Sequence, residues 1–402
     1  MQDGYSATKI KALVKAQPKG HALLRGFYKD PDIYEAEMQT LFGRHWLFAG
    51  HVSQIPNIGN YILVEFDTES IIVTRTEATE FSAHMNVCRH RGSRICLEKS
   101  GHAKSFTCPY HAWAYDLRGN LIAAGQMEAG FDKTAYSLRA VQVENIHGFL
   151  LISLADAPLS LAPMKNALGD ILPIFETENL QLAEMKSYEI EANWKLAVEN
   201  YQECYHCAPA HKEFAQIHAM ARDLPRFKAL KSEYEKTMPS GGIMSEKNGY
   251  FDLAEPGAEG FQYGRNPLLE GCQTGSKDGT PLAPFLGRIE AYTGGASELM
   301  LGPFMYFLIY DDHMVGYRFR PTAIDRCVCD IYWFVRDSAR AGQDYDLEPL
   351  TWLWDVTTEA DKTIIRRNQA GVNSRYYKPG PLSQMEHFQQ SFLNWYLAAL
   401  GR

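Results

Sequence analysis

Two short stretches of the sequence each place one cysteine close to one histidine. The first, CRHRG, contains Cys88 and His90, and the second, CPYHAW, contains Cys108 and His111. Two thiolates and two imidazoles can hold zinc in a tetrahedral site. They can equally hold a two-iron, two-sulfur cluster in which two histidines replace two cysteines. Each stretch supplies one ligand of each type, which favours a cluster with both thiolates on one iron and both imidazoles on the other.

A second group of possible metal ligands lies in NWKLAVENYQECYHCAPAH. His206 and His211 are five residues apart, and an ideal helix would turn their side chains about 140° away from each other. Pro209 lies between them and should break the helix, which would let both imidazoles reach one metal ion. Two imidazoles and one carboxylate form the facial triad that binds ferrous iron and leaves positions open for oxygen. The carboxylate should come from elsewhere in the chain.

The residues around the first group resemble a known family. The stretches NVCRHRGSRIC and FTCPYHAWAYDLRGNL closely resemble the Rieske domain of Rieske non-haem iron oxygenases, and the resemblance extends over about residues 25–400. It implies a [2Fe–2S] Rieske cluster and a mononuclear Fe(II). It also implies Asp361 as the missing carboxylate, because a late helix of the family carries an acidic residue eight positions before a Gln-x-Gly, as Asp361 precedes Gln369 here. Glu359 is the alternative ligand.

The resemblance also assigns roles to Asn200 and Glu203, which lie one helical turn apart next to the histidines. In the family, a carboxylate at the position of Glu203 is usually aspartate. It bridges a cluster histidine of one subunit to an iron-bound histidine of the next. Glutamate has one more methylene and could still bridge His111 and His206 by hydrogen bonds that fix their tautomers. We therefore expect Asn200 and Glu203 to take part in catalysis.

The glutamate also indicates a branch of the family. Glu203 and the run ENYQECYHC resemble the branch that oxidises quaternary ammonium compounds, such as the glycine betaine, stachydrine and carnitine oxygenases. This implies a monooxygenase that hydroxylates an N-methyl group with O₂, after which the carbinolamine loses formaldehyde. Aromatic faces would bind the cation, and the candidates for this role are Tyr201, Phe304, Tyr306 and Tyr310. Two other functions stay open, an aromatic-ring hydroxylating oxygenase and a Rieske electron-transfer protein without catalysis.

Three further cysteines are not expected to bind metal. Cys204 and Cys207 form a C-x-x-C around His206, which alone would suggest a redox or metal-binding pair. No βαβ pattern surrounds them, so we expect them to be packing residues. Cys96 lies between the two arms of the first group and matches no ligand position, so we expect a small buried residue.

The elements that position these residues follow from local patterns. Short β-rich runs such as NYILVEF and SIIVTR follow an early helix signalled by Asp30 and Pro31. Glycine and proline are frequent from residue 239 to about 290, which predicts a surface loop or a wall over a site. Strand-like runs then return, and two helices, at about 347–370 and 383–400, close the chain.

Together with the resemblance, these patterns predict an α+β fold with three parts. Residues 1–44 form an N-terminal helical segment, 45–155 a Rieske β domain, and 156–402 the catalytic domain. The proline-punctuated stretch LADAPLSLAP marks the boundary before the catalytic domain. The resemblance implies that the catalytic domain is a helix-grip (START-like) fold with an antiparallel sheet and a long helix.

Composition limits the partners and the compartment. The 402 residues include 40 Lys and Arg against 48 Asp and Glu, a net charge of −8 that argues against nucleic acid and anionic membranes. No signal peptide and no run of about 18 apolar residues is present, so we expect a cytoplasmic protein. The resemblance implies a head-to-tail homotrimer. It also implies a separate NAD(P)H-dependent reductase of the flavin and ferredoxin type, since the sequence has no G-x-G-x-x-G after a strand and no plant-type cysteine spacing.

Overall fold

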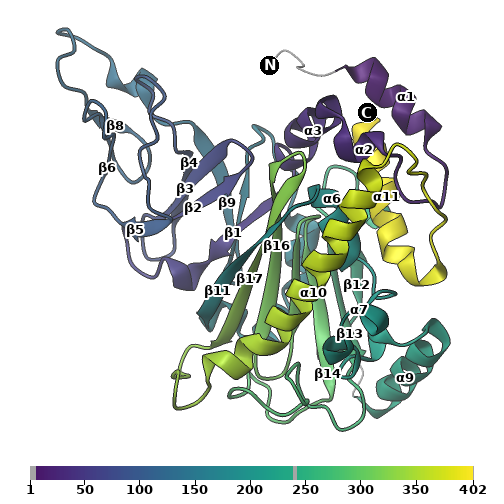
Figure 1. The fold of residues 1–402 in the computed structure, drawn as a ribbon. Helices are drawn as coiled ribbons and strands as arrows, with labels where there is room; N and C mark the ends of the chain where they lie inside the picture. The colour runs from purple at the N-terminus through teal and green to yellow at the C-terminus, as the bar shows by residue number, and fades with distance from the viewer. Residues whose placement is uncertain (1–5, 239–241, 402) are drawn as a thin grey trace. The chain divides into compact units, whose positions relative to one another are not determined.

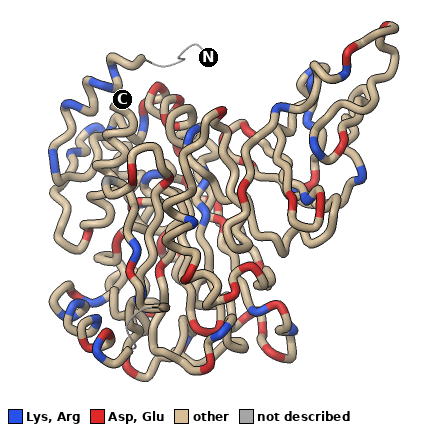
Figure 2. Tube along the Cα trace, turned by 180° about the vertical axis from the view of Figure 1, so that it is seen from behind, with Lys and Arg blue, Asp and Glu red and all other residues tan. Residues whose placement is uncertain are grey.

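The computed structural model describes residues 6–238 and 242–401 and divides into two compact units. The smaller unit is Arg44–Pro158, and the larger combines Met1–Gly43 with Leu159–Arg402 (Figure 1). Basic and acidic side chains are interspersed along both units (Figure 2). In the described part of the chain, no helix has the length and apolar character needed to cross a membrane.

The smaller unit is built from antiparallel strands. Its larger sheet has seven strands in the order β1-β10-β9-β4-β3-β2-β5. These are β1 (Leu47–His51), β2 (Asn60–Phe66), β3 (Glu69–Arg75), β4 (Phe81–Met85), β5 (Ser100–His102), β9 (Ala140–Ile146) and β10 (Phe149–Ser153). A second sheet contains β6 (Phe106–Thr107), β7 (Ala114–Tyr115) and β8 (Leu121–Ala123). The runs NYILVEF and ESIIVTR form the β2–β3 hairpin, because their β-branched side chains suit a buried pleated surface.

The larger unit contains a second seven-stranded antiparallel sheet, in the order β11-β17-β16-β15-β14-β13-β12. Its strands are β11 (Leu180–Ile190), β12 (Lys247–Gly249), β13 (Phe261–Pro267), β14 (Gly295–Leu301), β15 (Met305–Ile309), β16 (Met314–Ala323) and β17 (Arg326–Arg336). The expectation of a loop throughout 239–290 is therefore wrong for β12 and β13, and its first residues, 239–241, lie outside the described residues. Strands form there because FQYGRNP alternates buried and partly buried positions.

A 27-residue helix, α10 (Leu347–Asn373), packs on this sheet against β11 and against α6 (Trp194–Tyr201). Figure 1 shows α10 lying along the strands of the larger unit. The arrangement of one long helix against an antiparallel sheet confirms the predicted fold class. The other helices are α1 (Ala7–Ala16), α2 (Gly26–Lys29), α3 (Pro31–Glu37), α4 (Ala162–Leu168), α5 (Leu172–Phe175), α7 (Cys207–Ala210), α8 (Lys212–Ala215), α9 (Leu224–Thr237) and α11 (His387–Leu400).

Within the larger unit, a buried ion pair connects the N-terminal helices to α6. Glu37, at the end of α3, accepts hydrogen bonds from Lys195 Nζ at 2.6 Å and from Trp194 Nε1 at 2.8 Å. Glu37 and Lys195 have no exposed side-chain surface. Removing one partner would leave an uncompensated buried charge, which costs about 3–5 kcal/mol. This contact holds the start of α6, the helix that leads into the predicted iron site.

Candidate active site

In the smaller unit, two tight turns carry the predicted cluster ligands. Gly92 N–H donates to the carbonyl of Cys88 at 2.9 Å, and Ala112 N–H donates to that of Cys108 at 3.0 Å. Ala112 has a φ of +55°, which closes the second turn in the left-handed region. The side chains of both cysteines are buried, with 3% and 2% of their surface exposed, whereas His90 and His111 are exposed.

The four side chains are held in a defined arrangement. The rings of His90 and His111 lie 4.7 Å apart between centroids, and His90 stacks on Trp113. Burial raises the pKa of the Cys108 thiol, but nearby N–H groups and the Cys88 thiol outweigh it and lower that pKa. A lowered pKa favours the thiolate that binds metals. Two inner sulfurs and two outer imidazoles fit a Rieske cluster.

In the larger unit, the chain brings His206, His211 and Asp361 together. Asp361 Oδ1 lies 3.3 Å from His206 Nε2 and 3.1 Å from His211 Nε2. His206 and His211 flank the single-turn helix α7, and Asp361 projects from α10. The predicted break at Pro209 is wrong in position. Helix α6 already ends at Tyr201. Pro209 lies inside α7, which is a single turn, and the first turn of a helix tolerates proline.

Glu203 and Asn200 both contact His206. His206 Nδ1–H donates to Glu203 Oε1 at 2.5 Å, and the His206 backbone N–H donates to Oε2 at 3.2 Å. Asn200 Nδ2 lies 3.3 Å from His206 Nε2. The carboxylate therefore fixes the tautomer of His206 and directs Nε2 towards Asp361. The bridge from Glu203 to His111 of another subunit stays a prediction.

The electrostatics of this group suit a divalent cation. Burial alone would lower the pKa of His206, but Asp361 and Glu203 outweigh it and raise that pKa to about 9. Burial would raise the pKa of Asp361, but the two histidines outweigh it and lower that pKa. Both ring nitrogens of His211 and Oδ1 of Asp361 are buried and make no hydrogen bond of good geometry, although Nε2 and Oδ1 lie 3.1 Å apart. Such atoms are costly to bury unpaired, and a metal ion would satisfy them.

The cysteines on either side of His206 form a disulfide, so the expectation that they are only packing residues is wrong. Cys204 and Cys207 are bonded, with their Cα atoms 4.9 Å apart. Cys207 Sγ lies 3.9 Å from His206 Nε2, but a sulfur in a disulfide is not a thiolate ligand. The alternative carboxylate, Glu359, is 60% exposed and pairs with Lys362 at the surface. Asp361 is therefore the third ligand that the geometry favours.

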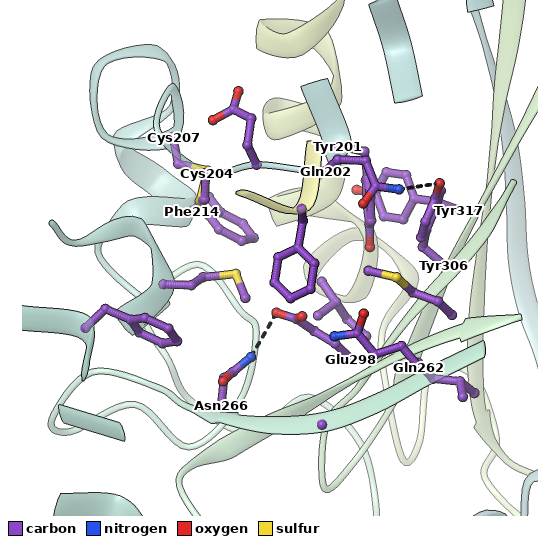
Figure 3. A pocket seen from close by; sticks show the side chains of 18 of the residues that line it. Tyr201, Gln202, Cys204, Cys207, Phe214, Gln262, Asn266, Glu298, Tyr306 and Tyr317 are labelled. Carbon is purple, nitrogen blue, oxygen red and sulfur yellow. Dashed lines mark hydrogen bonds between the residues drawn. A yellow bond between two sulfur atoms is a disulfide. The ribbon is translucent and has the colours of Figure 1, made fainter. Parts of the chain in front are cut away.

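A cavity of about 360 Å³ opens beside the three residues, and its lining includes His206, His211 and Asp361. Tyr201 and Tyr306, two of the predicted aromatic residues, line it and stack on each other with their centroids 4.5 Å apart. Figure 3 shows both rings with Tyr317 on one side of the cavity.

The other two predicted aromatic residues do not line the cavity. Phe304 stacks on Phe42 at 4.2 Å and packs edge-on against Trp194. Tyr310 makes a hydrogen bond of 2.6 Å with His218 Nε2. Strand β15 spans only Met305–Ile309, so Phe304 and Tyr310 lie beyond its ends and do not share the face of Tyr306.

The cavity contains polar residues that the sequence reasoning missed. Gln262 and Asn266 in β13 and Glu298 in β14 line one wall and surround its lower part in Figure 3. The sequence FQYGRNP contained a signal for the two amides. Gln262 and Asn266 are four residues apart, so in a strand their side chains lie on the same face.

Comparisons with known proteins agree with this geometry. Residues 45–143 match the Rieske [2Fe–2S] domain family, and residues 177–402 match the family of the ring hydroxylating alpha subunit (catalytic domain). The glycine betaine monooxygenase oxygenase subunit of Chromohalobacter salexigens is 34% identical over 387 residues, which cover 96% of this chain and 87% of that protein. The carnitine monooxygenase oxygenase subunit of Escherichia coli (strain K12) is 29% identical, with 88% and 84% covered.

A solved structure supports the fold. A crystal structure of the quaternary ammonium Rieske monooxygenase CntA with an inhibitor superposes with a TM-score of 0.72 at 21% identity, and covers 100% of this chain and 98% of that chain. The two matched domains imply a Rieske cluster and a mononuclear iron as cofactors. The chain belongs to the Rieske non-haem iron oxygenases, as the oxygenase subunit of a monooxygenase.

Proposed function

We propose that this protein hydroxylates an N-methyl group of a small quaternary ammonium compound of the betaine type, such as glycine betaine, stachydrine or carnitine. The observation that carries this proposal is the group of His206, His211 and Asp361 at a cavity with stacked tyrosines. The names of the relatives in Chromohalobacter salexigens and Escherichia coli support it. The glutamate at position 203 supports the same branch.

We assign the two metal sites as follows. Cys88 and Cys108 would hold one iron of the Rieske cluster, and His90 and His111 the other. The mononuclear iron would be held by three further residues, His206, His211 and Asp361. When bound, this iron supplies the oxygen chemistry.

The residues around the iron site have separate tasks. Glu203 accepts a hydrogen bond from His206 Nδ1–H. This keeps the proton on Nδ1 and leaves Nε2 free to bind the metal. Asn200 Nδ2 lies 3.3 Å from the same Nε2, and because this nitrogen has a single lone pair, the iron would take the place of that contact. Tyr201 and Tyr306 present aromatic faces to the cavity, where a quaternary nitrogen gains cation–π stabilisation of about 0.5–2 kcal/mol. Hydroxylation of the methyl carbon gives a carbinolamine, which loses formaldehyde, so the net reaction is N-demethylation.

An oxygenase subunit of such a multicomponent system receives electrons from a reductase. We propose that this reductase is NAD(P)H-dependent and of the flavin and ferredoxin type. We further propose that the subunits form a head-to-tail homotrimer, in which Glu203 connects His206 to His111 of the neighbouring subunit. Analytical ultracentrifugation would test the trimer.

Turnover assays test the proposed reaction. The oxygenase and a surrogate Rieske reductase are incubated with glycine betaine, carnitine, choline or simple arenes, and formaldehyde and O₂ consumption are measured. We expect formaldehyde from at least one ammonium compound, in step with O₂ consumption. Hydroxylation of an arene without demethylation would favour the ring-hydroxylating alternative. An iron content of about two per chain, instead of about three, would favour an electron carrier.

A further inference from the structure

One carboxylate in the cavity wall is not used by the metal sites. Glu298 lies in β14 directly opposite Gly264 in β13. Gln262 lies two positions before Gly264 and Asn266 two positions after it. Because side chains alternate along a strand, both lie on the same face of the sheet as Glu298. A Cβ added to Gly264 would meet no atom within 4 Å. The space over Gly264 is therefore open to the cavity and bordered by these three side chains.

This part of the wall offers oxygen acceptors. Glu298 Oε1 accepts a hydrogen bond from Asn266 Nδ2 at 3.0 Å. Gln262 Oε1 and Asn266 Oδ1 are buried and have no hydrogen-bond partner in the described part of the chain. Buried acceptors without partners are costly, so a ligand that brings positive charge to them would be stabilised.

The negative charge of Glu298 is not balanced by a neighbouring cation. Among the described residues, Glu298 forms no ion pair, and the nearby Lys231 pairs with Glu246 at 2.5 Å. Burial raises the pKa of Glu298, and the Asn266 hydrogen bond and the charge of Lys231 oppose this only in part. A raised pKa disfavours the carboxylate form of Glu298, and a cation held beside it would stabilise that form, because the surroundings screen the attraction weakly.

We propose that Glu298, together with the amide oxygens of Gln262 and Asn266, binds the positively charged nitrogen of the substrate. A quaternary nitrogen has no N–H to donate, so negative charge and aromatic faces must hold it in place of ordinary hydrogen bonds. The wall from β13 and β14 supplies the negative charge, and Tyr201 and Tyr306 supply the aromatic faces (Figure 3). This inference rests on the proposed function and makes Glu298 the residue that selects cationic substrates over neutral molecules of the same shape.

The test uses pairs of compounds that differ only in the charged atom. Glycine betaine is compared with 3,3-dimethylbutanoate, and choline with 3,3-dimethylbutan-1-ol, in which carbon replaces the nitrogen. The Kd of each compound for the iron-loaded oxygenase is measured by isothermal titration calorimetry. For the wild type, we expect the cationic member of a pair to bind at least about tenfold more tightly.

Three variants identify the source of this preference. Glu298→Gln keeps the shape and removes the charge, so it should raise the Kd of choline about tenfold or more and leave the Kd of its neutral analogue, 3,3-dimethylbutan-1-ol, unchanged. Glu298→Asp keeps the charge and should retain most of the preference. The control is Glu235→Gln, which removes an equal charge from an exposed residue of α9 that does not line the cavity. It should leave the ratio of the two Kd values unchanged.

The outcomes separate the two proposals. If the wild type releases formaldehyde from an ammonium compound but Glu298→Gln keeps the full charge preference, the assignment of Glu298 is overturned and the proposed function stands. If the wild type demethylates no ammonium compound, the proposed function fails and the assignment fails with it. An unchanged Rieske absorption spectrum and thermal midpoint show that each variant is folded. If Glu298→Gln does not fold, loss of the preference in a folded Glu298→Ala supports the assignment, and its retention refutes it.

Discussion

Replacing Asp361 with alanine should remove the mononuclear iron and leave the Rieske cluster in place. Oδ1 of Asp361 lies 3.3 and 3.1 Å from the Nε2 atoms of His206 and His211, so the variant loses the only carboxylate that approaches both nitrogens in the described residues. A cluster with one mononuclear iron amounts to about three irons per chain, and we expect about two in the variant. Loss of a residue that only supports a metal ligand typically lowers metal affinity or activity by about 10–100-fold. Loss of a ligand itself should therefore lower kcat/KM by more than about 100-fold.

The assay combines iron analysis, the visible spectrum of the cluster and formaldehyde release. Glu359→Ala is a matched control, because Glu359 lies two residues earlier on α10, is exposed and pairs with Lys362. It should keep both the iron and the activity. The reasoning is refuted if Asp361→Ala retains the third iron and its turnover. Loss of the cluster spectrum would refute the division of ligands between the two sites.

The remaining predictions concern stability. Arg318 and Arg320 outweigh burial and lower the pKa of Asp330 to about 2, so Asp330→Asn should lower the free energy of unfolding in urea at pH 7 by about 3 kcal/mol. This contribution should weaken as the pH falls below 3.8 towards 2. Burial lowers the pKa of His84 from 6.5 to about 4. Between pH 6.5 and 4, the His84 imidazole therefore binds a proton in the unfolded chain but not in the folded one. The free energy of unfolding should fall by about 3 kcal/mol as the pH drops across this range. Thermal melts of His84→Leu should lack this pH dependence. Phe304→Ala should cost about 3–5 kcal/mol in the same urea assay and leave KM for the amine unchanged, because Phe304 packs away from the cavity; a raised KM would contradict that placement.

The ligand turns could be predicted because their signal is local. Cys108 and His111 are three residues apart, so one short turn carries both, and the types and spacing of the residues favoured a cluster over zinc before the resemblance pointed to the same group. The proposed third iron ligand was harder to identify. Asp361 is 150 residues beyond His211, and only the resemblance to a family distinguished it from Glu359. In the structure, the two acidic residues differ by their face of α10, one towards the histidines and one towards solvent.

The cavity could be predicted only in part, because its walls depend on strand ends and register. Phe304 and Tyr310 were predicted together with Tyr306 as aromatic residues that bind the cation, but β15 spans only Met305–Ile309 and both lie beyond its ends. The polar wall depends on Glu298 lying opposite Gly264, and the pairing of β13 with β14 sets this alignment across some 30 residues of chain. A single sequence gives the alternation within each strand but not the register between them.

The eight-residue spacing between Asp361 and Gln369 has a physical reason. The Gln369 side chain is buried, and its Oε1 accepts a hydrogen bond of 2.8 Å from the backbone N–H of Asn193. Asn193 caps α6 by accepting from Lys195 N–H at 3.1 Å, so Gln369 fixes α10 to the start of the helix that leads to His206. Eight residues of helix span about 12 Å, and Asp361 is thereby held at a set height along α10. Two contacts at opposite ends of this span, one to Asn193 and one to the histidines, define how α10 lies on α6. The eight-residue spacing that pointed to Asp361 in the sequence therefore separates two contacts of α10, one with the cap of α6 and one with the histidines of the proposed iron site.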